Sequence, residues 1–274
     1  MTERRASRPP SYRSREVPNV LFEPLHESAL TLGDADDVGP TPQPPWLADA
    51  FASDPHLFDR GILKAGKEAD VHIVEVRGGG PDGETLGLLA EKRYRADAGR
   101  GDRHDPYRLG RAALGRFTIA AAGGWAELEF ALLSALWEAG VAVPFPVLRT
   151  GDRFLLELIG DQATGEAAPR LVSCRPERSQ LPDLWAQTRC LLEGLVDAGV
   201  AHGDLSPYNL LVDKGRLVMI DLPQAVDLVA HPGGLDLLHR DCTNVAVWFR
   251  RRGMAEDQAD PETLFAGLLP RVWP

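Results

Sequence analysis

One short segment, residues 201–224, limits what this chain can fold into more than any other part of the sequence. Asp204 is followed five residues later by Asn209, and Asp221 closes an apolar run twelve residues after that. The sequence Asp-Lys-Gly at residues 213–215 predicts a tight turn between two short strands. A rigid loop followed by such a strand pair would bring the three polar side chains to one point, so we expect a single site there.

The apolar and polar residues of this segment are expected to point in opposite directions. The apolar ones would anchor the loop in the core: Leu205, Leu210, Leu211 and Val212. The polar ones would face a cleft: His202, Asp204, Ser206 and Asn209. A single aspartate or asparagine in such a loop more often caps a turn. The combined spacing instead favours phosphoryl transfer, which needs one carboxylate at the acceptor hydroxyl, and an amide and a second carboxylate for metal ions. Because a carboxylate at the exit of a buried strand needs a partner, Mg²⁺ is a natural companion for Asp221.

Composition restricts the class of protein. With 274 residues, 44% of them hydrophobic, the chain can bury a sizeable core as one bilobal unit or two small domains. No apolar run approaches the ~18–20 residues of a membrane span, and the N-terminus lacks the apolar stretch of a secretory signal. The scattered cysteines favour a reducing cytoplasmic location over a disulfide framework or a zinc site. The net charge of −10 does not support a nucleic-acid or ribosome contact, although a local patch stays open.

The first 44 residues differ in composition from the rest. Residues 1–44 are rich in Pro, Arg, Ser and Asp and hold few aromatics, so we expect a mostly disordered tail. Its beginning is basic and residues 33–37 are acidic. A solvated tail is favoured over one that docks on a partner or on the chain's own surface. Structure is expected to begin near Pro45, with a short helix over residues 46–59.

A lysine after a glycine-containing loop is the next candidate. Two predicted strands flank residues 64–70, where Gly66 allows a tight turn and a close approach to a phosphate. The loop is neither G-x-G-x-x-G nor a Walker A sequence, so alone it is more typical of a plain hairpin. Lys92 ends the following strand and could reach the α and β phosphates. It needs an acidic partner, and the helical repeat of residues 125–137 offers Glu127 and Glu129.

Several further elements are expected. Residues 93–116 are rich in arginine, and a solvated loop is favoured there over a substrate or RNA contact. Residues 153–160 are predicted to form a strand that ends at a glycine, as a hinge between two lobes would. An adenine would hydrogen-bond the backbone near Glu157 and Ile159, although a buried strand with one outward glutamate explains the same pattern. An amphipathic helix is expected over residues 181–198, and two final helices over residues 235–251 and 261–269.

Six stretches resemble the RIO family of atypical serine/threonine protein kinases, closest to the subfamily without an N-terminal winged helix. In chain order they are residues 66–69, 125–129, 156–160, 202–209, 220–226 and 240–245, of which the last two are the specific ones. The resemblance implies a bilobal protein-kinase-like α+β fold, with a β-rich N-lobe over residues 45–158 and a helical C-lobe over residues 159–274. It also implies the absence of an activation segment.

The resemblance further implies that ATP binds between the lobes with Mg²⁺ or Mn²⁺. Lys92 would hold the phosphates and Glu129 would pair with it, while Asp204 would act as the catalytic acid/base. Asn209 and Asp221 would bind metal. In this family the metal-binding aspartate can itself accept phosphate, so Asp221 is also a candidate for an aspartyl-phosphate in an ATPase cycle. The remaining candidates for nucleotide binding are Lys64, Gly66, Lys67, Glu68, Ala69, Glu157 and Ile159.

The chain departs from the family pattern at three positions. Gly203 stands where an alanine is usual, Pro207 where a glutamate or similar polar residue is usual, and Lys64 where a small hydroxyl residue is usual. The stretch His-Gly-Asp-Leu-x-Pro-x-Asn is instead similar to aminoglycoside phosphotransferases and choline-type kinases. The leading prediction is a RIO-type kinase or ATPase. A small-molecule phosphotransferase and a non-enzymatic nucleotide-binding switch are the alternatives, and the acceptor, protein or small molecule, stays open.

Overall fold

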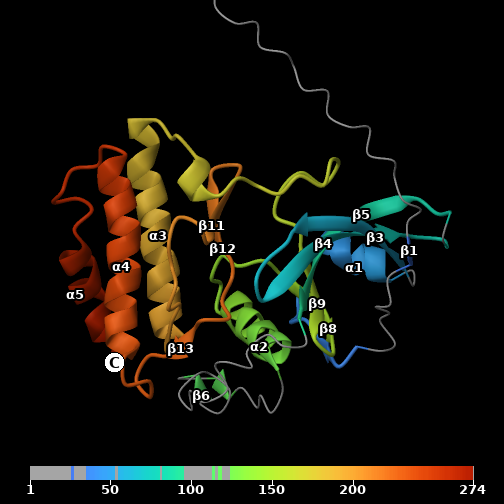
Figure 1. The fold of residues 1–274 in the computed structure, drawn as a ribbon, viewed down its shortest axis with the longest axis horizontal. Helices are drawn as coiled ribbons and strands as arrows, with labels where there is room; N and C mark the ends of the chain where they lie inside the picture. Colours follow the sequence, from blue (N-terminus) through green and yellow to red (C-terminus); the bar gives the residue numbers. More distant parts are fainter. Residues whose placement is uncertain are drawn as a thin grey trace, which may run out of the picture.

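The computed structural model describes residues 26–27, 35–52, 55–80, 82–95, 113–114, 117–118 and 124–273. Figure 1 shows the large sheet on one side of these residues and a group of helices on the other. The helices are α1 (Pro45–Phe51), α2 (Trp125–Glu138), α3 (Leu181–Asp197), α4 (Gly234–Arg251) and α5 (Pro261–Val272), with two short 3₁₀ turns at Leu171–Ser173 and Arg178–Gln180. This arrangement confirms the predicted α+β fold. The boundary between the lobes, placed after residue 158, stays an interpretation.

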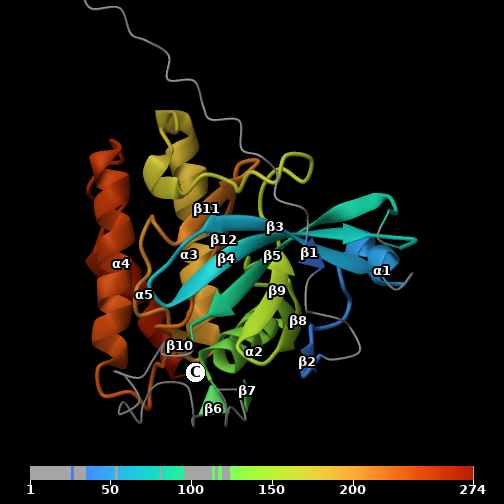
Figure 2. The ribbon, with the colours of Figure 1, turned by 45° about the vertical axis from the view of Figure 1, so that its right-hand side comes forward.

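The sheet is antiparallel and has seven strands in the order β1-β3-β4-β5-β9-β8-β2. Its members are β1 (His26–Glu27), β2 (Asp37–Val38), β3 (His56–Lys64), β4 (Ala69–Arg77), β5 (Thr85–Tyr94), β8 (Pro146–Thr150) and β9 (Arg153–Glu157). The remaining described strands form three two-stranded sheets: β6 (Ala113–Leu114) with β7 (Phe117–Thr118), β10 (Val200–Ala201) with β13 (Val226–Asp227), and β11 (Leu210–Asp213) with β12 (Arg216–Met219). Figure 2 shows β3, β4, β5, β9 and β8 side by side.

Helix α1 packs on the sheet and has a shorter span than predicted. Its Leu47 joins Leu57 and Val74 in one apolar cluster, which buries the face of the sheet away from the predicted site. The helix ends at Phe51 and β3 follows, so the prediction of a helix over residues 46–59 is wrong at its C-terminal end. Pro55 lacks the amide hydrogen that a continuing helix would need, and the residues after it bury apolar side chains in the sheet instead.

The tail prediction also differs from the structure in part. Residues 37–38 pair with β8 at the edge of the sheet, and Gly39 and Pro40 are buried. The guanidinium of Arg149 binds the carboxylates of both Asp36 and Asp37, so the acidic residues of this segment serve as a structural contact. Residues 1–25 and 28–34 lie outside the described residues.

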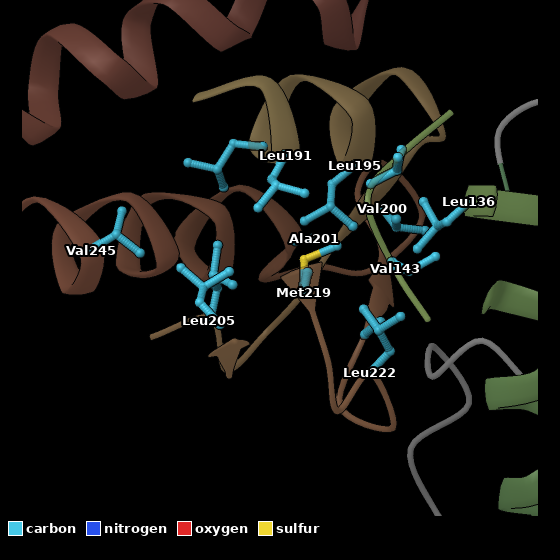
Figure 3. Close-up of a cluster of buried hydrophobic side chains, with 14 of the residues drawn as sticks. Leu136, Val143, Leu191, Leu195, Val200, Ala201, Leu205, Met219, Leu222 and Val245 are labelled. Atoms are coloured by element: carbon cyan, nitrogen blue, oxygen red, sulfur yellow. The ribbon is translucent and has the colours of Figure 1, made fainter. Parts of the chain in front are cut away.

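The helical part has one continuous apolar core. Figure 3 shows Leu191 and Leu195 of α3 pointing toward Ala201 and Met219, with Leu205 beside them. Leu205 and Leu210 are fully buried in this core, as predicted, and Val212 packs against it partly buried. Leu211 instead lines a cavity. The cluster continues into α2 through Leu136, so the two parts share packing. Among the described residues, no helix combines the length and the apolarity that crossing a bilayer requires.

Candidate active site

A cavity of about 730 Å³ lies between the sheet and the helical part. From the sheet and α2 it is lined, among others, by Lys64, Gly66, Lys67, Glu68, Ala69, Lys92, Glu129 and Glu157, and from the later part of the chain by Ile159, Arg170, Asp204, Leu211, Asp221 and Arg240. The structure therefore brings every predicted site residue except Asn209 to the wall of one cavity. Asn209 lies directly behind Asp204, as described below. Arg170 and Arg240 were not among the predicted residues.

The glycine-containing loop forms one end of this cavity. Lys64 ends β3 and Ala69 begins β4, and the amide of Gly66 donates to the Asp70 carboxylate at 3.1 Å. A Cβ added to Gly66 would lie 2.4 Å from the carbonyl oxygen of Ala69. Because that approach leaves no room for a side chain, the loop needs glycine at this position. The result is a tight turn whose backbone faces the cavity.

Lys92 makes the ion pair that the sequence led us to expect. Its Nζ lies 2.7 Å from the Glu129 carboxylate and 3.0 Å from Oδ1 of Asp221. Glu129 also accepts hydrogen bonds from the Tyr94 hydroxyl and from the amide of Leu222. Three donors from β5 and from the chain after β12 thus converge on one buried carboxylate of α2. Of the two acids considered for this role, Glu129 and Glu127, the structure selects Glu129.

The charges of this cluster stabilise one another. Burial acts to lower the pKa of Lys92, but the carboxylates of Glu129 and Asp221 outweigh it and hold this pKa above its ordinary value. Burial acts to raise the pKa of Asp221, and the ammonium of Lys92 outweighs it, so this pKa lies below its ordinary value. Asp221 has φ +69°, a backbone conformation that side-chain-bearing residues adopt at a cost of about 1–3 kcal/mol. Such strain is typical of residues held for a function.

The Asp204 loop is held by Asn209. The side-chain amide of Asn209 donates to the backbone oxygen of Asp204 at 2.9 Å and lies 3.4 Å from its carboxylate. The amide of Ile220 donates to the carbonyl of Asn209, which connects the loop to the chain just before Asp221. Asp204 itself is exposed at the cavity. The spacing of the three residues therefore produces the predicted convergence.

Two neighbouring residues of the loop, His202 and Gly203, have roles that the sequence did not predict. His202 is fully buried, so the prediction that it faces the cleft is wrong. Its Nδ1 accepts from the amide of Asp204, and its Nε2 lies 3.2 Å from the Ile220 carbonyl. Burial lowers the pKa of His202, which fits a neutral ring that donates through Nε2. Gly203 has φ +77°, and a Cβ there would lie 2.5 Å from the Gln224 carbonyl oxygen, so glycine is required.

A buried acid from a distant helix supports this loop. Asp241 of α4 is fully buried. Its two oxygens accept from the amides of Gly203 at 2.9 Å and Leu205 at 2.8 Å, on either side of Asp204. Arg240 donates to the Gly203 carbonyl. The stretch 240–245 had been noted only for its resemblance. No local pattern marks an acid that binds amides far away along the chain.

Asp241 is expected to make stability depend on pH. Burial raises the pKa of Asp241 to about 7, against the opposing effects of the two amides and of Arg240. Between about pH 4 and 7 the native state therefore keeps a proton that the unfolded chain has released, so the unfolding free energy falls as pH rises, by a few kcal/mol. Urea unfolding at several pH values between 4 and 8 measures this. The unfolding free energy of Asp241→Asn should decline less steeply with pH than that of the wild-type protein. Identical slopes for the two proteins would contradict the assignment of this pH dependence to Asp241.

Comparison with known proteins identifies the family. Residues 92–263 match the RIO domain. The chain is 36% identical over 208 residues to the RIO-type serine/threonine-protein kinase Rio1 of Haloferax volcanii, which covers 75% of this chain and 67% of that protein. It is 35% identical over 140 residues to the serine/threonine-protein kinase RIO3 of Bos taurus (50% of this chain, 26% of that one). It is 34% identical over 138 residues to the serine/threonine-protein kinase RIO1 of Chaetomium thermophilum (47% and 26%).

The chain thus spans two thirds of the Haloferax protein and about a quarter of the other two. The matched domain begins at Lys92 and includes Glu129, Asp204, Asn209 and Asp221, while the glycine-containing loop precedes it. A match over more than half of the chain, together with a relative of this identity and coverage, establishes the relationship. The chain belongs to the RIO family of serine/threonine-protein kinases.

Proposed function

We propose that this RIO kinase transfers the γ-phosphoryl group of ATP to a serine or threonine hydroxyl, with Asp204 as the base at that hydroxyl. The observation that carries the proposal is the convergence of Lys92, Glu129 and Asp221 with Asp204 on one cavity between two parts of the chain. Phosphoryl transfer depends on positioning and charge stabilisation more than on covalent chemistry by the protein. These side chains supply both.

The cavity suits a nucleotide. Its volume of about 730 Å³ lies within the usual range of roughly 300–1,000 Å³ for small-molecule sites. Val71, Ala90 and Leu158 give it apolar walls for a base. The carbonyl of Ile159 already accepts from the amide of Ala168, and within the described part of the chain no group accepts the Ile159 amide hydrogen. That donor supports the expectation that adenine binds the hinge backbone near Glu157 and Ile159.

The donors near Asp204 suit a hard divalent cation. The side-chain nitrogen of Asn209 donates to the backbone oxygen of Asp204, which leaves Oδ1 of Asn209 as an acceptor. The carboxylate of Asp221 is partly exposed. Amide and carboxylate oxygens are the ligands that Mg²⁺ and Mn²⁺ prefer. The described residues contain no group of three or more His, Cys, Asp or Glu side chains that could hold a metal, so phosphate oxygens and water would complete the coordination. When bound, the ion neutralises charge on the phosphates.

The protein groups divide the reaction between them. Lys92, held by Glu129, would bind phosphate oxygens and fix the nucleotide. Asp204 would accept the proton of the attacking hydroxyl as the new oxygen–phosphorus bond forms. The bond between the γ-phosphorus and the β,γ-bridging oxygen would break at the same time, and ADP would leave with that oxygen. His202 and Asp241 would keep the loop in place without contacting the substrate.

Incubation of the purified protein with γ-labelled ATP and Mg²⁺, without an added acceptor, tests the proposal. Acid-stable label on serine or threonine is expected for a protein kinase. A hydroxylamine-labile label that Asp221→Asn abolishes would assign an aspartyl-phosphate, and so an ATPase cycle, to the same site. If ATP were consumed only after addition of an aminoglycoside or an amino alcohol, the protein-kinase proposal would be replaced by a small-molecule one.

A further inference from the structure

Two arginines meet on the surface of the helical part, at the end of α4. Arg252 holds its guanidinium over the ring of Trp248, 5.1 Å from the centroid, and donates to the carbonyl of Val172 at 3.2 Å. Arg178 lies across Gly253, since a Cβ added to this glycine would be 3.2 Å from Nε of Arg178. Figures 1 and 2 show that the start of α3 and the end of α4 lie at the same end of the helical part. These contacts hold the two guanidinium groups on one patch of surface.

Neither arginine is neutralised by an acid within the described part of the chain. Arg250, in the same turn of α4, pairs with Asp260, whereas Arg178 and Arg252 form no salt bridge. The acid next to Arg178 in the chain, Glu177, accepts a backbone amide of its own turn. In a protein with a net charge of −10, unpaired cations at one place run against the overall charge. Two exposed arginines adjoin the pair in the chain, and the four define an arginine surface: Arg175, Arg178, Arg251 and Arg252.

The arginine surface adjoins the loop that carries Asp204. The amide of Val172, whose carbonyl binds Arg252, donates to the carbonyl of Pro207 at 3.0 Å. Because Pro207 comes only three residues after Asp204, the backbone of Asp204 and the guanidinium of Arg252 are at most about 25 Å apart. Tyr208, the next residue, is 59% exposed and offers an aromatic contact on the same loop. A short peptide whose hydroxyl lies at Asp204 could therefore reach the arginine surface.

We propose that the arginine surface docks an acidic segment of the protein acceptor, so that the kinase prefers serines and threonines with carboxylates nearby. The proposal rests on the proposed function, because it takes a protein hydroxyl as the phosphate acceptor. Guanidinium groups bind carboxylates through charge-assisted hydrogen bonds. An extended peptide spans about 3.3–3.6 Å per residue, so the carboxylates would lie within about seven residues of the acceptor hydroxyl. The position beside the Asp204 loop favours the acceptor over a nucleic acid, which has no need to reach the base.

Two matched serine peptides test this surface, by fluorescence anisotropy for binding and by label transfer from γ-labelled ATP for kinetics. One carries glutamates within about seven residues of the serine, and the other carries lysines at the same positions. The full chain should bind the glutamate peptide about tenfold more tightly than the lysine peptide, and high salt should reduce this preference. Arg178→Glu should raise the dissociation constant and the KM of the glutamate peptide by about tenfold. Its kcat should be unchanged, because docking stabilises the ground state and the transition state equally.

Exchanging the charges separates docking from a structural effect. Arg178→Glu should bind the lysine peptide more tightly than the wild-type protein does, a gain that a general loss of structure cannot produce. Arg252→Met keeps an apolar stem over Trp248 but removes the charge, and it should also weaken binding of the glutamate peptide. Arg189→Glu, on the exposed surface of α3, makes the same charge change and is the control. It should leave the affinity for both peptides as it is in the wild-type protein.

The outcomes distinguish this surface from the proposed function. If the glutamate peptide bound through Arg178 but neither peptide nor the protein itself became labelled, the proposed function would fail and the site for acidic segments would stand. If the wild-type protein bound both peptides equally, or Arg178→Glu bound the glutamate peptide as tightly as the wild-type protein, the docking surface would be refuted. Tighter binding of a single-stranded RNA than of the glutamate peptide, lost in Arg178→Glu, would assign the surface to nucleic acid and overturn the proposal.

Discussion

Replacing Asp204 with asparagine is expected to lower kcat for phosphoryl transfer by about 10²–10⁴-fold, the usual contribution of a positioned general base. ATP affinity should be largely kept. Asparagine has nearly the same shape but cannot accept the proton of the acceptor hydroxyl. The loop around it is held through backbone groups by Asn209 and Asp241, so its geometry does not depend on the Asp204 charge. Single-turnover rates together with ATP binding by calorimetry measure the two quantities separately.

Asp236→Asn is a matched control for this prediction. Asp236 is an exposed acid in the first turn of α4, and it does not line the cavity. The control removes the same charge and should keep kcat within a factor of about two, since surface changes of this kind are nearly neutral. If Asp204→Asn kept the wild-type rate, Asp204 would not be the base. If it lost ATP affinity as severely as rate, the residue would serve binding instead of proton transfer.

The parts of the site that local sequence determines were predicted well. The Asp-Lys-Gly turn at residues 213–215 joins β11 to β12 as expected, with Lys214 and Gly215 at positive φ. The periodicity of residues 125–137 gives a helix, and its inward face carries the acid that binds Lys92. Local spacing fixes such features because a turn or a helix forms from contacts between near neighbours. The resemblance then selected Glu129, which periodicity alone left equal to Glu127.

The parts that depend on distant contacts could not be predicted from the sequence. Asp241 resembles any surface acid of an amphipathic helix until α4 packs against the Asp204 loop. Arg170 carries no local signal, and only the turn after the hinge brings it to the cavity. Composition made residues 35–44 look disordered, yet Arg149 supplies the partner that their acids need. For Asp241, Asp36 and Asp37, the charge is satisfied by a group far along the chain, and the spacing of residues holds no record of that partner.

Replacing Glu129 with alanine is expected to lower the free energy of unfolding by about 3–5 kcal/mol, the usual cost of breaking a buried ion pair from one side. The carboxylate is buried and accepts from Lys92, Tyr94 and the amide of Leu222. Its removal leaves all three donors without this acceptor at a position where Lys92, Tyr94 and Glu129 are buried. Since Leu222 directly follows Asp221, the change also frees the segment of this proposed metal ligand from α2, and the rate of phosphoryl transfer should fall together with stability. Urea unfolding gives the first quantity and single-turnover rates the second.

Glu127→Ala separates this specific effect from the general cost of shortening a glutamate on α2. Glu127 lies two residues earlier in the same helix and is more exposed, so its replacement should change the unfolding free energy by no more than about 0.5 kcal/mol. Glu129→Gln keeps an acceptor oxygen for Lys92 but removes the charge, and should therefore fall between the two alanine variants. An unfolding free energy for Glu129→Ala equal to that of Glu127→Ala would mean that Asp221 alone satisfies Lys92. In that case α2 would not be what couples the two lobes at this site.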